Sequence, residues 1–172
     1  MSDPDLPYSQ PVRLHQVGSG VTRRLEPDAA ARARIAKALD LASLDAFSAE
    51  MTLAPAPGGW RLSGRVKASL AQTCGITLEP LPVEVDASFA IPLAEAESAD
   101  GDSDEIVITL DDESPDPIEG GQVDLGQYAV EQLALQLDPF PRKPGAEFVQ
   151  PPEPTEISPF AVLKQLRSTD EG

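Results

Sequence analysis

The only cysteine and the only histidine of this 172-residue sequence are its first candidates for chemistry. A reactive cysteine needs a base or a cation beside it to hold the thiolate. His15 lies far from Cys74 in the sequence, and no local signature of a cysteine hydrolase surrounds the thiol. One Cys and one His also cannot supply the nitrogen and sulfur ligands of a zinc site. We therefore expect no catalytic residue, no metal and no cofactor.

Carboxylates are the second candidates, because Asp and Glu can transfer protons. Glu131 stands out, since it interrupts an otherwise apolar helical pattern. One interpretation places it on the exposed seam of that helix. In the other it is at least half-buried and pairs with an Arg of the basic N-terminal third, because an unpaired buried charge is costly. The acidic run Asp100–Glu105 lacks the spacing of an EF-hand loop, and the sequence has no glycine-rich phosphate loop.

The third candidate is a basic stripe. Arg61, Arg65 and Lys67 alternate with apolar residues in "WRLSGRVKASL", so a strand would carry all three on one face. They could contact the phosphates of an RNA. The interpretation we favour is a solvated outer face of a sheet.

Charge is distributed very unevenly along the chain. Residues 68–141 contain 17 Asp and Glu and no Lys or Arg, whereas the formal net charge of the whole chain is −16. Such a segment repels phosphate backbones. It is therefore suited to a basic protein partner, or simply to solubility, and not to nucleic acid.

These candidates must be positioned by strands and helices that the pattern also indicates. Alternation of apolar and polar residues predicts strands over Gln10–Val17, Ala46–Pro55, Trp60–Leu70 and Leu81–Leu93, and an apolar run predicts another over Ile106–Leu110. Cys74 falls in the bend between the third and fourth of these strands, as a buried thiol. Gly64, inside a strand, indicates a bulge or a close backbone approach.

Helices are predicted in three places. One runs from Glu26 to about Leu41, where Ala, the best helix former, dominates. A second covers 124–137, with Asp124 and Gln127 as a capping box. A short third helix in "SPFAVLKQL" is too short to be stable alone and must dock on something.

The resulting expectation is an α+β fold. It consists of a twisted antiparallel sheet of about five strands, with the Leu-rich helix 124–137 packed on one face; a partly closed barrel is the alternative. Residues 1–141 would form a single domain with acidic loops at 94–105 and 111–121. Residues 142–172 would form a Pro-rich linker and the short C-terminal helix.

The cellular location is also bounded by the sequence. No apolar run is long enough to span a membrane, and the N-terminus lacks the basic start and apolar core of a secretory signal. A single cysteine agrees with a reducing compartment. We expect a cytoplasmic protein.

Three stretches resemble the YceD family of large ribosomal RNA subunit accumulation proteins. "LAQTCGITLEPLPVEV" is similar to its central C-x-x-C-L-x-P-type motif, and "DPIEGGQVDLGQYAVEQLALQLDPFPRKPG" to its second signature. "SPFAVLKQL" resembles its C-terminal N/S-P-F-x-x-L element. Many relatives carry C-x-x-C, whereas Ala71 occupies the earlier position here, which argues against a metal or redox role for Cys74.

The resemblance singles out a set of motif residues as candidates for interaction. They are Gln72, Thr73, Cys74, Glu79, Pro80, Asp124, Leu125, Gly126, Glu131, Arg142, Pro159 and Phe160.

The resemblance implies a bacterial, non-enzymatic ribosome biogenesis factor that supports accumulation of large-subunit (23S) rRNA. Its acidic middle would hold a basic ribosomal protein, free or within a pre-large-subunit particle, because complementary charge steers association. An alternative is direct rRNA binding by the basic strand and helix of residues 23–67. A third hypothesis, an enzyme that uses Cys74 or Glu131, is the weakest.

Overall fold

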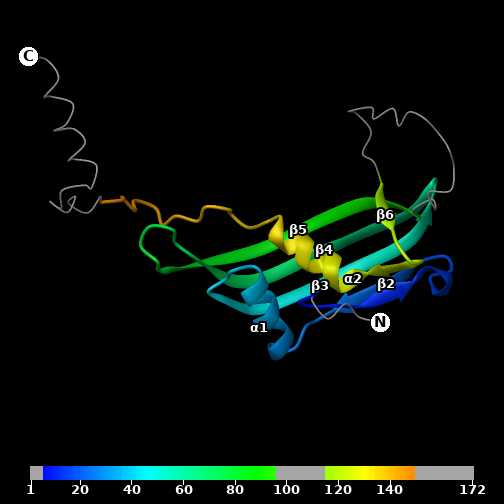
Figure 1. Ribbon diagram of the computed structural model, residues 1–172, viewed down its shortest axis with the longest axis horizontal. Helices are drawn as coiled ribbons and strands as arrows, with labels where there is room; N and C mark the ends of the chain where they lie inside the picture. Colours follow the sequence, from blue (N-terminus) through cyan, green and yellow to red (C-terminus); the bar gives the residue numbers. More distant parts are fainter. Residues whose placement is uncertain (1–5, 96–114, 150–172) are drawn as a thin grey trace, which may run out of the picture.

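The computed structural model describes residues 6–95 and 115–149, and a curved sheet dominates it (Figure 1). The five-stranded sheet has the order β2-β3-β4-β5-β6. Its strands are β2 (Val21–Leu25), β3 (Ser43–Ala56), β4 (Gly59–Thr73), β5 (Pro80–Glu95) and β6 (Asp116–Ile118). A second sheet pairs β1 (Pro11–Arg13) with β7 (Gln122–Asp124), and the helices are α1 (Ala29–Ala38), α2 (Leu125–Ala134) and the short 3-10 helix η1 (Leu14–Gln16).

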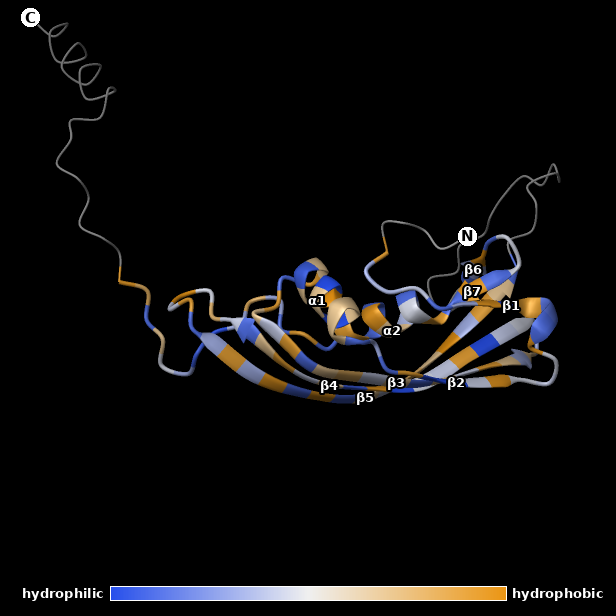
Figure 2. Ribbon diagram, turned by 90° about the horizontal axis from the view of Figure 1, so that it is seen from below, coloured by the Kyte–Doolittle hydropathy of each residue, from blue (hydrophilic) through white to orange (hydrophobic). Residues whose placement is uncertain are grey.

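The three long strands follow the predicted alternation. Along β4, Leu62, Val66, Ala68 and Leu70 are buried, whereas Arg61, Ser63, Arg65, Lys67 and Ser69 alternate with the inward-facing residues and point to the opposite side. Figure 2 shows both helices on the concave side of the curved sheet, and the buried apolar residues of the sheet and the helices form one core cluster. The convex face is left to polar and small residues. The core therefore lies between the sheet and the helices.

Gly64 is the close-approach position that its place in a strand predicts. A Cβ there would lie 2.6 Å from the carbonyl oxygen of Glu50 and 3.0 Å from the ring of Phe89. The bulge lies elsewhere, in β3, where the register shifts between Leu44 and Ala46. Gly58 and Gly59 form the turn between β3 and β4 with positive φ angles of 81° and 148°.

The prediction of a purely antiparallel sheet is wrong, because β6 runs parallel to β5. After β5 the chain returns to lie beside β5, on the side away from β4, and runs in the same direction as β5. Asp116 therefore pairs with Leu93. Burial of Ile118 in the core explains why part of the predicted acidic loop 111–121 is a strand. The sheet of about five strands is confirmed. It is not closed into a barrel, and the helices fill its concave side.

The first predicted strand is mostly wrong. Only Pro11–Arg13 is extended, and it pairs with β7 outside the main sheet. The chain then turns into η1, where the backbone N–H of Leu14 donates to Gly121. β2 has no counterpart among the predicted strands, because Val21–Leu25 is short and rich in Arg. Its pairing with β3 holds it in place and includes a 2.9 Å hydroxyl contact between Thr22 and Thr52.

The two predicted helices that fall on described residues both exist but are shorter than expected. α1 begins after Asp28, whose carboxylate accepts from the backbone N–H of Ala31 at 2.7 Å and thereby satisfies a free donor of the first turn. α2 ends at Ala134, and its buried residues Leu125, Ala129 and Leu133 recur every four positions, on the face towards β4.

Some predictions fall on residues that the structure does not describe. These are the strand Ile106–Leu110, most of the acidic loop 94–105 and the short C-terminal helix. Among the helices of the described residues, none is long and apolar enough to cross a membrane.

Candidate functional site

The bend that carries Cys74 is joined to the segment that follows α2. The backbone N–H of Gly75 donates to Pro141 at 2.9 Å, and the side-chain amide of Gln72 donates to the carbonyl of Asp138 at 2.9 Å. The ammonium of Lys143 lies 2.8 Å from a carboxylate oxygen of Glu79. We call this contact between residues 72–79 and 138–143 the hairpin clasp. It closes the end of the sheet at which the chain leaves the fold (Figure 1).

Local geometry explains why residues 74–79 turn so tightly. The backbone N–H of Leu78 donates to the carbonyl of Cys74, and the N–H of Cys74 donates to the carbonyl of Glu79. Leu78 adopts a positive φ of 59° and exposes 75% of its surface. A leucine with this positive φ angle is strained. The two backbone hydrogen bonds therefore offset the strain and keep the bend in this conformation.

Cys74 is the buried centre of the hairpin clasp. Its sulfur accepts from the backbone N–H of Lys143 at 3.3 Å and of Thr77 at 3.4 Å, and the residue is 0% exposed. Hydrogen bonds from Thr77, through its side chain and its backbone, with those from the backbone of Lys143 and Ile76, lower the pKa of the thiol to about 6. Burial opposes this shift, but the donors outweigh it.

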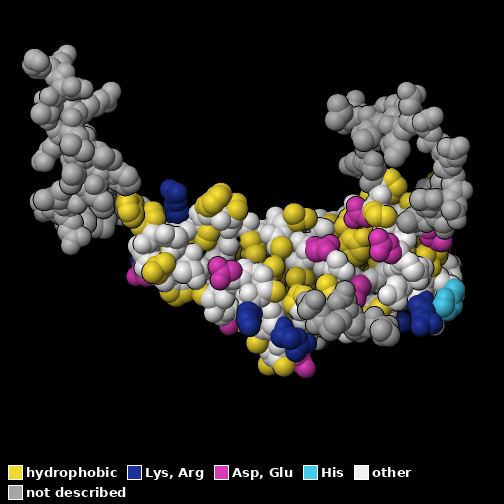
Figure 3. Space-filling model, viewed as in Figure 1, with side chains coloured by type: hydrophobic (Ala, Val, Ile, Leu, Met, Phe, Trp, Pro, Cys, Tyr) yellow, Lys and Arg dark blue, Asp and Glu magenta, His cyan; other side chains and the backbone are white. Residues whose placement is uncertain are grey.

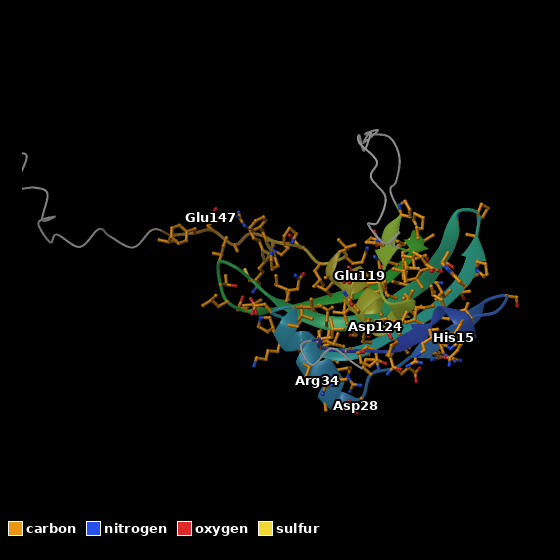
Figure 4. All side chains as sticks on the ribbon, turned by 45° about the vertical axis from the view of Figure 1, so that its right-hand side comes forward. His15, Asp28, Arg34, Glu119, Asp124 and Glu147 are labelled. Atoms are coloured by element: carbon orange, nitrogen blue, oxygen red, sulfur yellow. The ribbon has the colours of Figure 1, made fainter. Side chains whose placement is uncertain are left out.

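This environment polarises the thiol and also shields it. A nucleophile needs access to its substrate and a base within reach, and the sulfur has no exposed surface. His15 lies at the opposite end of the molecule from Glu147, which follows the hairpin clasp in the chain (Figure 4). The structure therefore brings no Cys–His pair together. Within residues 6–95 and 115–149, no three His, Cys, Asp or Glu side chains are grouped to hold a metal ion.

The second motif forms another contact, at the start of α2. Asp124 caps the helix by accepting from the backbone N–H of Gln127 at 3.1 Å. Its carboxylate also accepts from the backbone N–H of Gln10 at 2.7 Å and from the hydroxyl of Ser9. We call this contact of residues 9–10 with 124–126 the N-terminal junction. The reciprocal half of the predicted capping box is absent, because the side chain of Gln127 donates instead to Glu131 at 2.8 Å.

Gly126 and Leu125 complete the N-terminal junction. A Cβ on Gly126 would lie 2.8 Å from the backbone nitrogen of Gln10 and 2.9 Å from the carbonyl carbon of Ser9. Leu125 is fully buried, and its N–H donates to Gln10. The "DLG" sequence thus lets the N-terminal segment lie directly against the first turn of α2.

Most of the singled-out motif residues therefore lie at the two ends of α2. Gln72, Cys74 and Glu79 contact the segment that follows the helix, residues 138–143. Asp124, Leu125 and Gly126 lie at the start of the helix and contact residues 9–10. Thr73 pairs with Pro80 at the base of the bend, and Arg142 is an exposed residue of the clasp segment. Pro159 and Phe160 lie outside the described residues.

Glu131 is exposed, in agreement with the exposed-seam interpretation, and its hydrogen-bond partner is Gln127 and not an Arg.

The predicted basic stripe lies on the outer face of β4, but acidic residues share that face. The guanidinium of Arg65 donates to Asp86 at 2.7 Å, and the ammonium of Lys67 lies 3.7 Å from the same carboxylate. The hydrogen bond from Arg65 lowers the pKa of Asp86. Arg61 is exposed. Because Glu50 and Glu84 also lie on this face, opposite Arg65 and Ser69, the stripe is not a continuous basic surface.

Acidic side chains gather around α2, β6 and β7. Figure 3 shows the magenta carboxylates over these elements, and Figure 4 places Glu119 and Asp124 beside the helix. We define the acidic patch as Asp116, Glu119 and Glu131, which are all exposed. Burial, together with the negative charges of Asp116 and Glu131, raises the pKa of Tyr128, on α2, to about 12. Sequence reasoning named Glu131 but did not associate it with β6.

Comparison with known proteins identifies one family. The model described as "Large ribosomal RNA subunit accumulation protein YceD" matches residues 62–167, which include the hairpin clasp, β6 and α2. No curated protein and no solved structure matches the chain.

Proposed function

Because the chain belongs to the YceD family of large ribosomal RNA subunit accumulation proteins, we propose that it acts by binding a basic ribosomal protein. The family name implies a role in the accumulation of large-subunit rRNA. In this proposal the chain is not an enzyme. It holds its partner either free or within a pre-large-subunit particle, and so supports the rRNA indirectly.

The observation that carries the proposal is the absence of Lys and Arg from residues 68–141, which hold 17 acidic residues. The acidic patch exposes three of these carboxylates around α2. Such a surface attracts a basic protein at long range and increases the rate of encounter. It repels rRNA. The role in large-subunit rRNA accumulation that the family name implies is then best explained by binding of a protein partner.

The test measures binding of individually purified large-subunit ribosomal proteins to the full chain. At least one basic protein should bind, and its Kd should rise steeply with salt. Changing Asp116→Asn, Glu119→Gln and Glu131→Gln together should weaken binding by about tenfold or more, because the electrostatic attraction is lost.

A matched control removes three charges elsewhere. The triple change Asp40→Asn, Asp45→Asn and Glu50→Gln alters the net charge equally but spares the acidic patch and β5. It should leave the Kd within about threefold of the original value. Equal weakening by both variants would mean that net charge alone, and not the acidic patch, attracts the partner. Binding by none of the proteins would refute the proposal.

A further inference from the structure

One long edge of the main sheet has no strand beside it in the described structure. β5 pairs with β4 from Pro80 to Leu93, but β6 covers its other side only at Leu93–Glu95. The edge from Pro80 to Pro92 is therefore free within the part of the chain that the structure describes. An uncovered edge presents backbone N–H and C=O groups that can pair with another strand.

Prolines protect the ends of this edge but not its middle. Pro80, Pro82 and Pro92 cannot donate to an added strand. The nine residues 83–91 contain no proline, and an ordinary strand needs only about five or six residues. This stretch is long enough to accept one.

The inner side of the same stretch is apolar and incompletely covered. Val83, Ala87, Phe89 and Ile91 pack against the core but remain half-exposed, because α2 lies against β4. A strand added to the edge would cover apolar side chains here as well as satisfy backbone groups. Both gains favour binding.

Charge selects what kind of strand could bind. β5 carries Glu84, Asp86 and Glu95 and has no Lys or Arg, although Asp86 is already paired with Arg65 and Lys67 of β4. The edge ends at β6, where Asp116 of the acidic patch pairs with Leu93. A strand that pairs with the free edge of β5 and continues past Leu93 therefore reaches Asp116 of the acidic patch.

We propose that the free edge of β5, residues 83–91, accepts an extended basic segment of the protein partner as an added strand. This inference rests on the proposed function and supplies its binding mode. Backbone hydrogen bonds to the edge would provide affinity, and the acidic patch would select the basic sequence.

The first experiment measures hydrogen exchange of the individual amides of β5 by NMR, in the full chain. In an antiparallel pair, alternate N–H groups point to the neighbouring strand and the others point away. In the free chain, the amides of residues 83–91 that point away from β4 should exchange fast. Saturation with the ribosomal protein that binds in the salt experiment should slow the same amides by at least about tenfold.

The second experiment uses two prolines, Ala87→Pro and Ser88→Pro. Ala87 and Ser88 are neighbours, so the N–H of one points to β4 and the N–H of the other points to the free edge. Only the proline that removes the N–H towards β4 breaks a hydrogen bond of the sheet. The variant that keeps the original thermal unfolding midpoint should bind the partner about tenfold more weakly. A folded proline variant with unchanged Kd would overturn the inference.

The outcomes separate this inference from the proposed function. If the partner binds but the edge amides keep their fast exchange, the edge is not the docking site, although the proposed function survives. If those amides are already protected in the free chain, and Thr109→Pro removes that protection, then Ile106–Leu110 of the same chain occupies the edge and the inference is wrong. If no ribosomal protein binds, the proposed function itself fails.

Discussion

At the scale of single residues, Cys74 shows how a motif position can hold a bend in place. Its sulfur accepts hydrogen bonds from Lys143 and Thr77, which come from both sides of the hairpin clasp. Sequence reasoning predicted a buried thiol at the bend, and the residue is indeed buried. The donors could not be anticipated, because Lys143 is distant in sequence and reaches the sulfur through its backbone.

The lowered pKa of Cys74 predicts a pH dependence of stability. Hydrogen bonds from Thr77 and from the backbone of Lys143 and Ile76 lower the pKa of the thiol from its ordinary value of 9.0 to about 6 in the folded chain. Between these values the folded state binds fewer protons than the unfolded state, so stability rises with pH across this window and is lost as the pH falls towards 6. Urea unfolding should show that the free energy difference between the original chain and Cys74→Ala grows from pH 6 to pH 9.

Two results would contradict this account of Cys74. A difference in unfolding free energy that does not change with pH would mean that the thiol is not ionised in the folded state. Rapid alkylation of Cys74 by iodoacetamide without denaturant would mean that the sulfur is accessible, contrary to its full burial.

At the scale of elements, α2 links two contacts that are distant in sequence. The N-terminal junction holds its first turn, and the hairpin clasp holds the segment after its last turn. The helix is only ten residues long and would be marginal by itself. Its position is therefore determined by tertiary contacts at both ends, in addition to the burial of Leu125, Ala129 and Leu133.

Gly126→Ala tests the N-terminal junction. Within a helix this change ordinarily stabilises by up to about 1 kcal/mol, but here the new Cβ would lie 2.8 Å from a backbone nitrogen. The clash should reverse the sign, and we expect a loss of about 1–3 kcal/mol in urea unfolding.

Gly75→Ala is the matched control, because a Cβ there meets only the carbonyl oxygen of Pro141, at an ordinary 3.8 Å. It should change the unfolding free energy by no more than about 0.5 kcal/mol. If Gly126→Ala were as stable as the original chain, Ser9 and Gln10 would not lie against α2 as the structure has them.

At the scale of the whole molecule, charge is separated by face and by segment. The outer face of the sheet carries both signs, as in the pairing of Arg65 and Lys67 with Asp86. The surroundings of α2 and β6 carry the acidic patch. The net charge of −16 makes the molecule as a whole repulsive to nucleic acid.

This charge distribution predicts that the chain does not bind rRNA directly. A large-subunit rRNA fragment should run unretarded in a gel with the full chain at about 0.15 M salt. The variant with Arg61→Ala, Arg65→Ala and Lys67→Ala should behave in the same way. Retardation that this variant abolishes would instead favour the alternative in which residues 23–67 bind RNA.

The sequence by itself determined the local features of this protein. Alternation predicted β3, β4 and β5, because an apolar face must be buried wherever it occurs along a strand. The helix-capping role of Asp124 and the uneven charge could likewise be read from neighbouring residues. The family resemblance, confirmed over residues 62–167, rests on the same local motifs.

Only the tertiary structure decided how these parts meet. The parallel return of β6, the free edge of β5, the hairpin clasp and the N-terminal junction all join residues far apart in the chain. Gln72 donates to Asp138, and Gln10 donates to Asp124. The periodicity of apolar residues along the chain does not indicate such pairs. They form only after the apolar faces have packed and brought distant backbone donors and acceptors within hydrogen-bonding distance.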